Sequence, residues 1–191
     1  MNEIILNELE LKTFTEQDTE DYCLLNNINH DNIIELYLGF NKLTDISGIK
    51  LFKNLEKLTL VENQLTNISV LNNLTKLYIH NNKIKDISVL KNIINYLICL
   101  RLDFNDISDI SVLKYLTDLQ ILYLGNNKIT DISVLKKLFK LKILNIKNLK
   151  LESDQIDCIK NLENLKTLFC KNGFKDMTIL NKLNKNIEII F

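Results

Sequence analysis

The feature that most constrains the fold is a phrase of residues that recurs five times between residues 33 and 135. It has the form L-x-x-L-x-L-x-x-N-x-[LI]-x-[DN]-I-S, where an apolar residue opens each unit at position 1 and an asparagine occupies position 9. These asparagines are Asn41, Asn63, Asn82, Asn105 and Asn127. A phrase that returns about every 20 residues predicts a stack of similar structural units, each in contact with its neighbours.

Each unit combines the periodicity of a strand with that of a short helix. The apolar residues at positions 4 and 6 alternate with variable ones, which is typical of a strand that is buried on one face. The later apolar residues, three to four apart, suit one helical turn on the opposite side. We therefore predict an α/β solenoid, a right-handed coil with a parallel concave β-sheet and short 3-10 or α-helical segments on the convex side.

The spacing between the asparagines varies, and the variation falls outside the strands. Asn41 to Asn63 and Asn105 to Asn127 are both 22 residues apart, whereas Asn63 to Asn82 is 19 and Asn82 to Asn105 is 23. Because the strand and asparagine positions stay in phase, we assign the lost or gained residues to the returning segments, Leu71 to Leu74 and Leu90 to Leu97, on the convex side.

The N-terminal region, residues 1 to 32, is predicted to be a cap with a helix. We assign Leu6, Leu9, Leu11 and Phe14 to positions 1, 4, 6 and 9 of a degenerate first coil. Thr15 and Asp18 form a helix N-cap pair that opens an amphipathic stretch through Tyr22, Cys23 and Leu25.

Residues 33 to 140 form the regular repeats, and residues 141 to 191 diverge from them. Leu149 takes the place of the asparagine in the first divergent coil. We expect an α-helix from about Asp154 to Asn161 and a last strand within residues 187 to 191. That strand is either covered by the chain's own side chains or a pairing edge. The whole chain is predicted to be a single domain.

The phrase Asn-x-[LI]-x-Asp-Ile-Ser-x-Leu resembles the short leucine-rich repeats of the phosphatase-1 regulator type and of bacterial internalins. The resemblance is strong over residues 33 to 135 and weak over 6 to 32 and 141 to 191. It implies a curved scaffold with a parallel sheet on its concave face, and such scaffolds usually bind another protein. In one branch of the resemblance, the implied function is regulation of a phosphatase-like enzyme.

Composition favours a compact protein without a strong electrostatic preference. The 191 residues include 24 basic and 24 acidic side chains, 46% of residues are hydrophobic, and the pI is near 6.7. Binding to nucleic acid or to an anionic membrane is therefore not favoured by the global charge. The first residues lack the basic start and apolar core of a signal peptide, and no apolar run approaches twenty residues. We expect a cytoplasmic, monomeric protein outside the membrane.

The cysteines do not predict a catalytic or metal site. Cys23, Cys99, Cys158 and Cys170 have no C-x-x-C spacing, so we interpret them as reduced structural thiols. We expect only Cys99, at position 3 of its strand, to be accessible. His80 lies about four residues away along the neighbouring strand, roughly 13 Å, which is too far for a Cys–His nucleophile. We expect no enzymatic activity and no cofactor.

The recurring polar residues are interpreted as structural. An asparagine at position 9 has donors and an acceptor for backbone groups where the strand turns, so the five predict a ladder from coil to coil. The aspartates at position 13 suit turn and helix capping better than calcium binding, because each is followed by an apolar residue and then Ser or Thr. They are Asp45, Asp86, Asp109 and Asp131, together with Asp176, which is at position 12 of a coil that is one residue short.

The candidate binding site is the concave face, where positions 3, 5, 7 and 8 point outward. The position 5 column contains Tyr37, Thr59, Tyr78, Arg101, Tyr123, Asn145 and Phe169. Phe40 and Phe104 at position 8 extend this aromatic surface. Aromatic residues and arginine are typical of interfaces. We expect Arg101 to lie between the rings of Tyr78 and Tyr123, ready for a carboxylate or backbone oxygen of a partner.

Charge gives this surface a direction, because the N-terminal cap is acidic and the distal coils are rich in lysine. On or beside the concave face, Lys142, Lys147 and Lys171 form a secondary basic patch. The leading hypothesis is a non-catalytic protein-binding scaffold. The alternatives are a regulatory subunit of a phosphatase-like enzyme and a salt-sensitive binder of nucleic acid or an anionic surface through the distal lysines.

Overall fold

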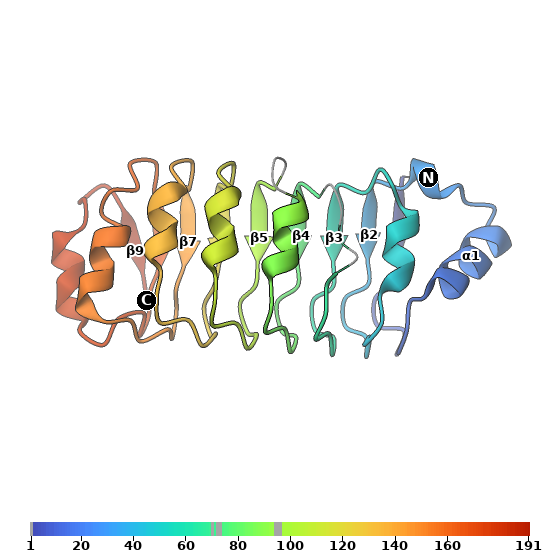
Figure 1. Cartoon of the computed structure of the whole chain (residues 1–191), viewed down its shortest axis with the longest axis horizontal. Coiled ribbons are helices and arrows are strands. Elements are labelled where there is room, and N and C mark those ends of the chain that lie inside the picture. Colours follow the sequence, from blue (N-terminus) through green and yellow to red (C-terminus); the bar gives the residue numbers. More distant parts are fainter. Residues whose placement is uncertain (1, 70, 72–73, 94–96) are drawn as a thin grey trace.

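The computed structural model describes residues 2–69, 71, 74–93 and 97–191. Its described part contains one parallel sheet of nine three-residue strands, arranged in sequence order along the long axis of the molecule (Figure 1). The strands are β1 (Glu3–Ile5), β2 (Glu35–Tyr37), β3 (Lys57–Thr59), β4 (Lys76–Tyr78), β5 (Cys99–Arg101), β6 (Ile121–Tyr123), β7 (Ile143–Asn145), β8 (Thr167–Phe169) and β9 (Glu188–Ile190).

Short helices return the chain along the other side of the sheet (Figure 1). Apart from the α-helix α1 (Glu16–Leu25), the described helices are 3-10 helices. They are η1 (His30–Asn32), η2 (Ser47–Leu51), η3 (Ser88–Ile93), η4 (Ser111–Tyr115), η5 (Ser133–Lys137), η6 (Ser153–Cys158) and η7 (Met177–Lys182). Each strand with its return is one coil, so the predicted solenoid is confirmed.

The strand register confirms that the repeats stay in phase despite their unequal lengths. Leu58 pairs with Leu77 across the 19-residue spacing, and Leu77 pairs with Leu100 across the 23-residue spacing. The differences are therefore absorbed by the returning segments. Parts of those segments, residues 72–73 and 94–96, lie outside the described residues.

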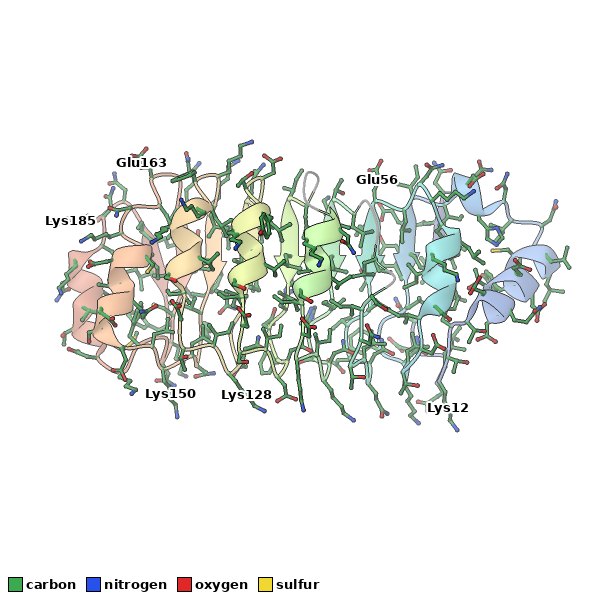
Figure 2. The ribbon with its side chains drawn as sticks, in the orientation of Figure 1. Lys12, Glu56, Lys128, Lys150, Glu163 and Lys185 are labelled. Carbon is green, nitrogen blue, oxygen red and sulfur yellow. The ribbon has the colours of Figure 1, made fainter. Side chains whose placement is uncertain are left out.

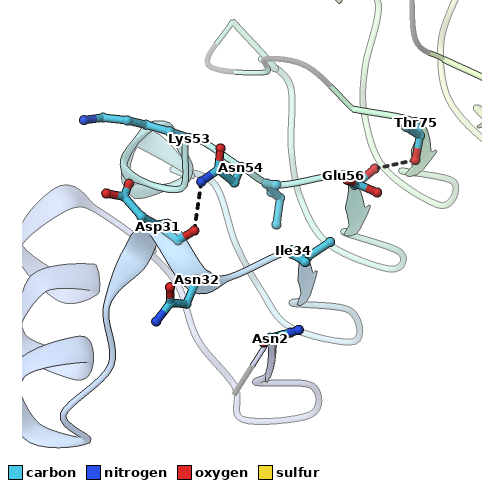
Figure 3. A pocket seen from close by; sticks show the side chains of 9 residues that line it. Asn2, Asp31, Asn32, Ile34, Lys53, Asn54, Glu56 and Thr75 are labelled. Atoms are coloured by element: carbon cyan, nitrogen blue, oxygen red, sulfur yellow. Dashed lines mark hydrogen bonds between the residues drawn. The ribbon is translucent and has the colours of Figure 1, made fainter.

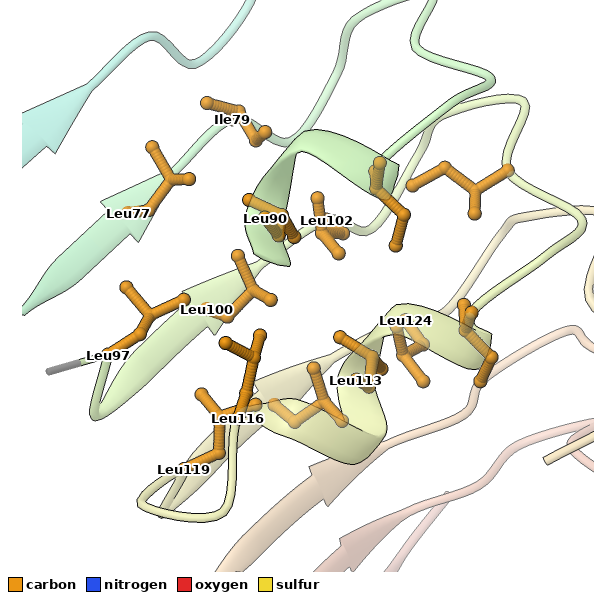
Figure 4. Close-up of a cluster of buried hydrophobic side chains, with 14 of the residues drawn as sticks. Leu77, Ile79, Leu90, Leu97, Leu100, Leu102, Leu113, Leu116, Leu119 and Leu124 are labelled. Carbon is orange, nitrogen blue, oxygen red and sulfur yellow. The ribbon is translucent and has the colours of Figure 1, made fainter. Parts of the chain in front are cut away.

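Stacked leucines and isoleucines fill the space between the sheet and the 3-10 helices (Figure 4). Leu100 and Leu122, at position 4 of adjacent coils, have no exposed surface. Leu113 of η4 and Leu116, the residue after it, belong to the same buried cluster. Full burial of one leucine side chain contributes about 1.5–3 kcal/mol. Each coil buries its apolar residues largely against the next, which explains why the phrase must repeat.

The predicted asparagine ladder is confirmed. Asn105 Nδ2 donates to the carbonyl oxygen of Leu102 in its own coil and to that of Ile79 in the preceding coil, both at 3.0 Å. Its Oδ1 accepts from the backbone N–H of Ile84, also at 3.0 Å. Asn41, Asn63, Asn82 and Asn127 repeat this arrangement. Each position 6 carbonyl from Leu38 to Leu102 thus accepts from the asparagines of two coils.

The ladder changes where the asparagine is replaced by Leu149, which is buried. A second, more exposed ladder begins nearby at position 8. Asn148 Nδ2 donates to Asn126 Oδ1 at 2.8 Å, and Asn172 Nδ2 donates to Asn148 Oδ1 at 3.1 Å. Side chains near the surface thereby replace part of the coil-to-coil bonding that the buried asparagines supply earlier.

The aspartates at position 13 confirm their predicted role in turns. Asp109 Oδ1 accepts from the backbone N–H of Ser111 at 2.8 Å, and this bond holds the turn that leads into η4. Four other aspartates likewise accept from the backbone N–H of the residue two positions later: Asp45, Asp86, Asp131 and Asp176.

The N-terminal cap begins in a different phase from the one predicted. Ile4 pairs with Leu36, so Leu6 occupies position 6 and Leu9 occupies position 9 opposite Asn41. The assignment of Leu6 to position 1 is therefore wrong. Leu9 is 54% exposed, and Asn41 of the next coil accepts a hydrogen bond from its backbone N–H.

Helix α1 starts as predicted, with a capping box between Thr15 and Asp18. Its amphipathic character is weaker than predicted, because Cys23 is buried whereas Leu25 is 86% exposed. The helix packs closely on η2, and a Cβ atom at Gly48 would lie 2.0 Å from Thr19 Oγ1. Gly48 is thus required by the close approach of these two helices.

The α-helix predicted from Asp154 to Asn161 is wrong, because the structure contains the 3-10 helix η6 (Ser153–Cys158) there. Ile156, Ile159 and Leu162 are all buried and are spaced three residues apart. A 3-10 helix has three residues per turn, so it aligns this spacing on one side better than an α-helix. The predicted last strand is present as β9, which pairs with β8.

Candidate protein-binding face

The face of the sheet opposite the core carries the side chains at positions 3, 5, 7 and 8, and we call it the open sheet face. Strand register places the predicted position 5 residues side by side in one column. Tyr37, Tyr78, Arg101, Tyr123 and Phe169 are all half-buried in it. Ile5 and Ile190 extend the column at its two ends, which the sequence analysis did not include.

Arg101 is not held free between the rings of Tyr78 and Tyr123 as predicted. Its guanidinium carbon lies 4.5 Å from the centroid of the Tyr123 ring, and the guanidinium also binds both carboxylate oxygens of Asp103 at 3.3–3.4 Å. Asp103 is only 4% exposed. Its position two residues after Arg101 on the same side of the strand was the signal for this pair. Arg101 is thus already partnered by the chain's own carboxylate.

Tyr123 and Phe169 meet although they belong to β6 and β8. Their ring centroids are 5.9 Å apart, and the side chain between them in the register, Asn145, folds back to accept from the backbone N–H of Lys147 at 2.9 Å. Lys147 Nζ in turn lies 5.4 Å from the Phe169 ring centroid. Arg101, Tyr123, Phe169 and Lys147 therefore form one continuous surface, which we call the distal platform.

A separate group of side chains, Glu35, Tyr37 and Lys57, occupies the other end of the column. Lys57 Nζ donates to Tyr37 Oη at 2.6 Å and to Glu35 Oε2 at 2.9 Å, and the Tyr37 hydroxyl donates to the same carboxylate. These hydrogen bonds, first that of Tyr37, lower the pKa of Glu35, and they raise the pKa of Lys57. Sequence analysis missed Glu35 and Lys57, although opposite charges at position 3 of adjacent coils signal a cross-strand pair.

The middle of the face is more buried than predicted. Cys99 is only 5% exposed, so the expectation of an accessible thiol is wrong. The longer side chains of Lys76 and Ile121 flank it in the register, and Tyr78 interacts with it from the adjacent strand. Burial, followed by the influence of Cys99, raises the pKa of Tyr78 to about 12. Burial and then Arg101 lower the pKa of His80.

Phe40 and Phe104 stand out from this buried centre, with 47% and 51% of their surface exposed. Both have a backbone φ of 56°, in the left-handed region that bulky side chains rarely adopt. Other coils place glutamate or asparagine at this position, and asparagine tolerates the conformation better than phenylalanine. Strained, exposed aromatic residues are more typical of binding surfaces than of stabilising contacts. Their role as site residues stays a prediction.

The predicted basic residues lie at the distal end of the face. Lys147 and Lys171 occupy position 7 of adjacent coils, and Lys171 is exposed. Lys142 Nζ donates to Gln120 Oε1 at 2.8 Å. Charged side chains also line both long edges of the molecule, among them Lys128 and Lys150 along one edge and Glu56 and Glu163 along the other (Figure 2).

A polar groove of about 670 Å³ lies away from the column, where β1 to β4 begin (Figure 3). Its polar groups partly bond one another, since Asn54 Nδ2 donates to the Asp31 carbonyl oxygen at 2.9 Å and Thr75 Oγ1 donates to that of Glu56 at 3.1 Å. The groove is lined by Asn2, Asp31, Asn32, Ile34, Lys53, Asn54, Leu55, Glu56 and Thr75. Its wide opening does not enclose a small molecule as a ligand pocket does.

The cysteine thiols are poorly suited to nucleophilic chemistry. Burial raises the pKa of all four cysteine thiols, that of Cys170 to about 11, which disfavours the nucleophilic thiolate. Over the described ranges, no three His, Cys, Asp or Glu side chains gather as a metal site. None of the helices described has the length and apolar character needed to cross a membrane.

Comparisons with known proteins agree with this architecture. The sequence matches the family described as leucine-rich repeats (two copies) over residues 53–92 and 97–137. The chain is a leucine-rich repeat protein. No curated protein sequence shows a significant match to this leucine-rich repeat protein.

Solved structures of other leucine-rich repeat proteins are similar over nearly the whole chain. An internalin from Listeria monocytogenes is 33% identical with a TM-score of 0.79; the match covers 97% of this chain and 57% of the internalin. Internalin C2 from the same organism is 27% identical with a TM-score of 0.80, covering 100% of this chain and 80% of its own. A leucine-rich repeat protein from Leptospira interrogans, 22% identical with a TM-score of 0.67, shares the fold over 95% of this chain and 52% of its own length.

Proposed function

We propose that this leucine-rich repeat protein is a non-catalytic scaffold that binds a protein partner on its open sheet face. The observation that carries the proposal is the column of half-buried aromatic and arginine side chains, interrupted by Thr59 and Asn145 and flanked by the exposed rings of Phe40 and Phe104. Such residues contribute large contact areas and are enriched in the centres of protein interfaces. Similarity to internalins, which are leucine-rich repeat proteins, supports an interaction scaffold in general terms.

The face has a suitable size for this function. Strands β2 to β8 carry the predicted column. Seven strands at about 4.8 Å, each with about 17 Å of chain along positions 3 to 8, project onto roughly 570 Å². A standard interface buries about 800 Å² on each partner, so the face, its side-chain relief and the adjoining loops are sufficient.

The structure also determines which substitutions test the proposal cleanly. Replacing Arg101 would leave Asp103 buried without its partner, and this would destabilise the protein independently of binding. The double variant Phe40→Asn/Phe104→Asn, which we call the face variant, avoids this problem because asparagine suits the left-handed backbone. A matched control is Tyr115→Ser/Phe139→Asn, which removes two exposed rings, 46% and 62% exposed, that lie outside the strands.

The test is a display selection with a library of random 16-residue peptides on the immobilised protein. We expect the recovered ligands to bind the face variant at least tenfold more weakly than the unmodified protein and to bind the control variant within twofold of it. Ligands that distinguish neither variant, or that lose affinity only for the control, would place binding elsewhere and refute the proposal.

A further inference from the structure

Charge divides the open sheet face into two halves. At positions 3, 5, 7 and 8 of the face and at position 2 beside it, the coils of β1 to β5 carry six carboxylates and three basic side chains, whereas those of β6 to β9 carry four lysines and one carboxylate. The first group is Glu3, Glu8, Glu35, Glu56, Glu62 and Asp103, with Lys57, Lys76 and Arg101; the second is Lys142, Lys147, Lys166 and Lys171, with Glu188. The zero net charge of the chain conceals this division.

The basic groups of the two halves also differ in what they already bind. Two of the three basic side chains in the first half, Lys57 and Arg101, are partnered by Glu35 and Asp103. In the second half, within the described part of the chain, none of the four lysines has its Nζ atom within 4 Å of a side-chain carboxylate. Lys147 Nζ contacts the Phe169 ring and, at 3.4 Å, the backbone oxygen of Phe191. The ammonium groups of these four lysines are thus not neutralised by any carboxylate side chain of the described residues.

We propose that the distal half of the open sheet face, β6 to β9, binds an acidic segment of the protein partner. This inference rests on the proposed function and specifies the chemistry of the partner. Carboxylates of the segment bind Lys147 and Lys171, whose strands are adjacent at about 4.8 Å. Its apolar side chains pack on the rings of Tyr123 and Phe169. The rings and the ammonium groups lie at positions 5 and 7, so one short segment contacts both.

The charge pattern favours an acidic peptide segment over nucleic acid. The basic half spans only four strands, roughly 14 Å across three spacings, and the rest of the face carries an excess of carboxylates. A long polyanion that followed the sheet would bring its phosphates against Glu35 and Glu62. A peptide places a few carboxylates locally and need not extend its negative charge over the acidic half.

The test compares Lys147→Gln/Lys171→Gln, the lysine variant, with the control Lys136→Gln/Lys137→Gln, which removes two exposed lysines from η5 on the other side of the coil. Random 16-residue peptides are selected on the unmodified protein. The face variant is measured separately, because Phe40 and Phe104 belong to the coils of β2 and β5, outside the distal half. We expect the enriched peptides to contain clustered Asp and Glu, to bind the lysine variant at least fivefold more weakly, and to bind the control within twofold.

The outcomes separate the two proposals. Enriched peptides that lose affinity for the face variant but lack acidic clusters, or bind the lysine variant normally, overturn the acidic-segment inference and leave the proposed function standing. A library that yields peptides sensitive to neither the face variant nor the lysine variant overturns both. A 24-nucleotide single-stranded DNA that binds more tightly than the peptides, and loses affinity on the lysine variant, identifies the distal half as a nucleic-acid surface and also overturns the inference.

Discussion

The asparagine ladder makes a quantitative prediction about stability. Asn105 is 8% exposed and makes three hydrogen bonds of 3.0 Å, to the carbonyl oxygens of Ile79 and Leu102 and from the N–H of Ile84. A net contribution near 1 kcal/mol for each bond gives about 3 kcal/mol for Asn105→Ala. In this variant the Ile79 carbonyl still accepts a hydrogen bond from Asn82, whereas the Ile84 N–H loses its acceptor, Asn105 Oδ1.

The assay is urea unfolding followed by circular dichroism, together with thermal unfolding. For a chain of this length, about 3 kcal/mol corresponds to a decrease in Tm of roughly 6–12 °C. The control is Asn181→Ala in η7, where the asparagine is exposed and a change within about 0.5 kcal/mol is expected. A loss below about 1 kcal/mol for Asn105→Ala would refute the ladder as a major source of stability.

Asn105→Asp tests the direction of the hydrogen bonds. One carboxylate oxygen still accepts from Ile84, but the other faces the carbonyl oxygens of Ile79 and Leu102, to which Nδ2 donates in the native protein. This repulsion raises the pKa of the introduced carboxyl group. We expect a greater loss than for Asn105→Ala at pH 7 and a partial recovery, relative to the native protein, near pH 4. Equal losses at both pH values would contradict the assigned geometry.

Three further predictions concern particular contacts. Gly48→Ala should destabilise the packing of α1 on η2 and increase proteolysis of the cap, because the added Cβ meets Thr19 Oγ1 at 2.0 Å; unchanged proteolysis would contradict this contact. Arg101→Ala should lower the free energy of unfolding in urea by about 3 kcal/mol or more, because it leaves the Asp103 carboxylate buried without a partner. Adding Asp103→Ala removes that unpaired charge and should recover part of the loss. A double variant less stable than Arg101→Ala would refute the pairing. Since the pKa of His80 is lowered below 6.5, its contribution to stability is complete above that pH and is lost as the pH falls. His80→Gln should therefore flatten the decrease in stability between pH 7 and pH 5, and an unchanged slope would exclude this effect.

The regular part of the fold was predictable because the same five or six positions recur in every coil. Asn63 and Asn82 keep their places across a shortened return, so the register of β3 and β4 follows from the sequence. The first coil was not predictable in the same way. It has no asparagine at position 9, and the spacing of Leu6 and Leu9 fits more than one phase. Only the pairing of Ile4 with Leu36 determines the phase.

The candidate site was predictable as a set of positions but not as a set of contacts. Strand periodicity alone placed Tyr123 and Phe169 in one column. Their contact depends on the Asn145 side chain folding back, and a side-chain conformation of this kind is set by the surrounding residues. The hydrogen bond between Arg101 and Asp103 likewise depends on a side-chain conformation that the surrounding residues set. Sequence reasoning therefore located the surface but overestimated how many of its charges are free for a partner.

We expect the replacement of the ladder asparagine by Leu149 to give the solenoid a boundary between two cooperative units. Coils up to Asn127 are joined by buried bonds that shield backbone amides, whereas the later coils rely more on exposed asparagine pairs. We expect the amides of β7 to β9 to exchange with deuterium before those of β3 to β6. The distal platform crosses this boundary, because Tyr123 lies before it and Phe169 after it. A partner seated there would join the two units, and its binding would appear as slower exchange in the distal coils.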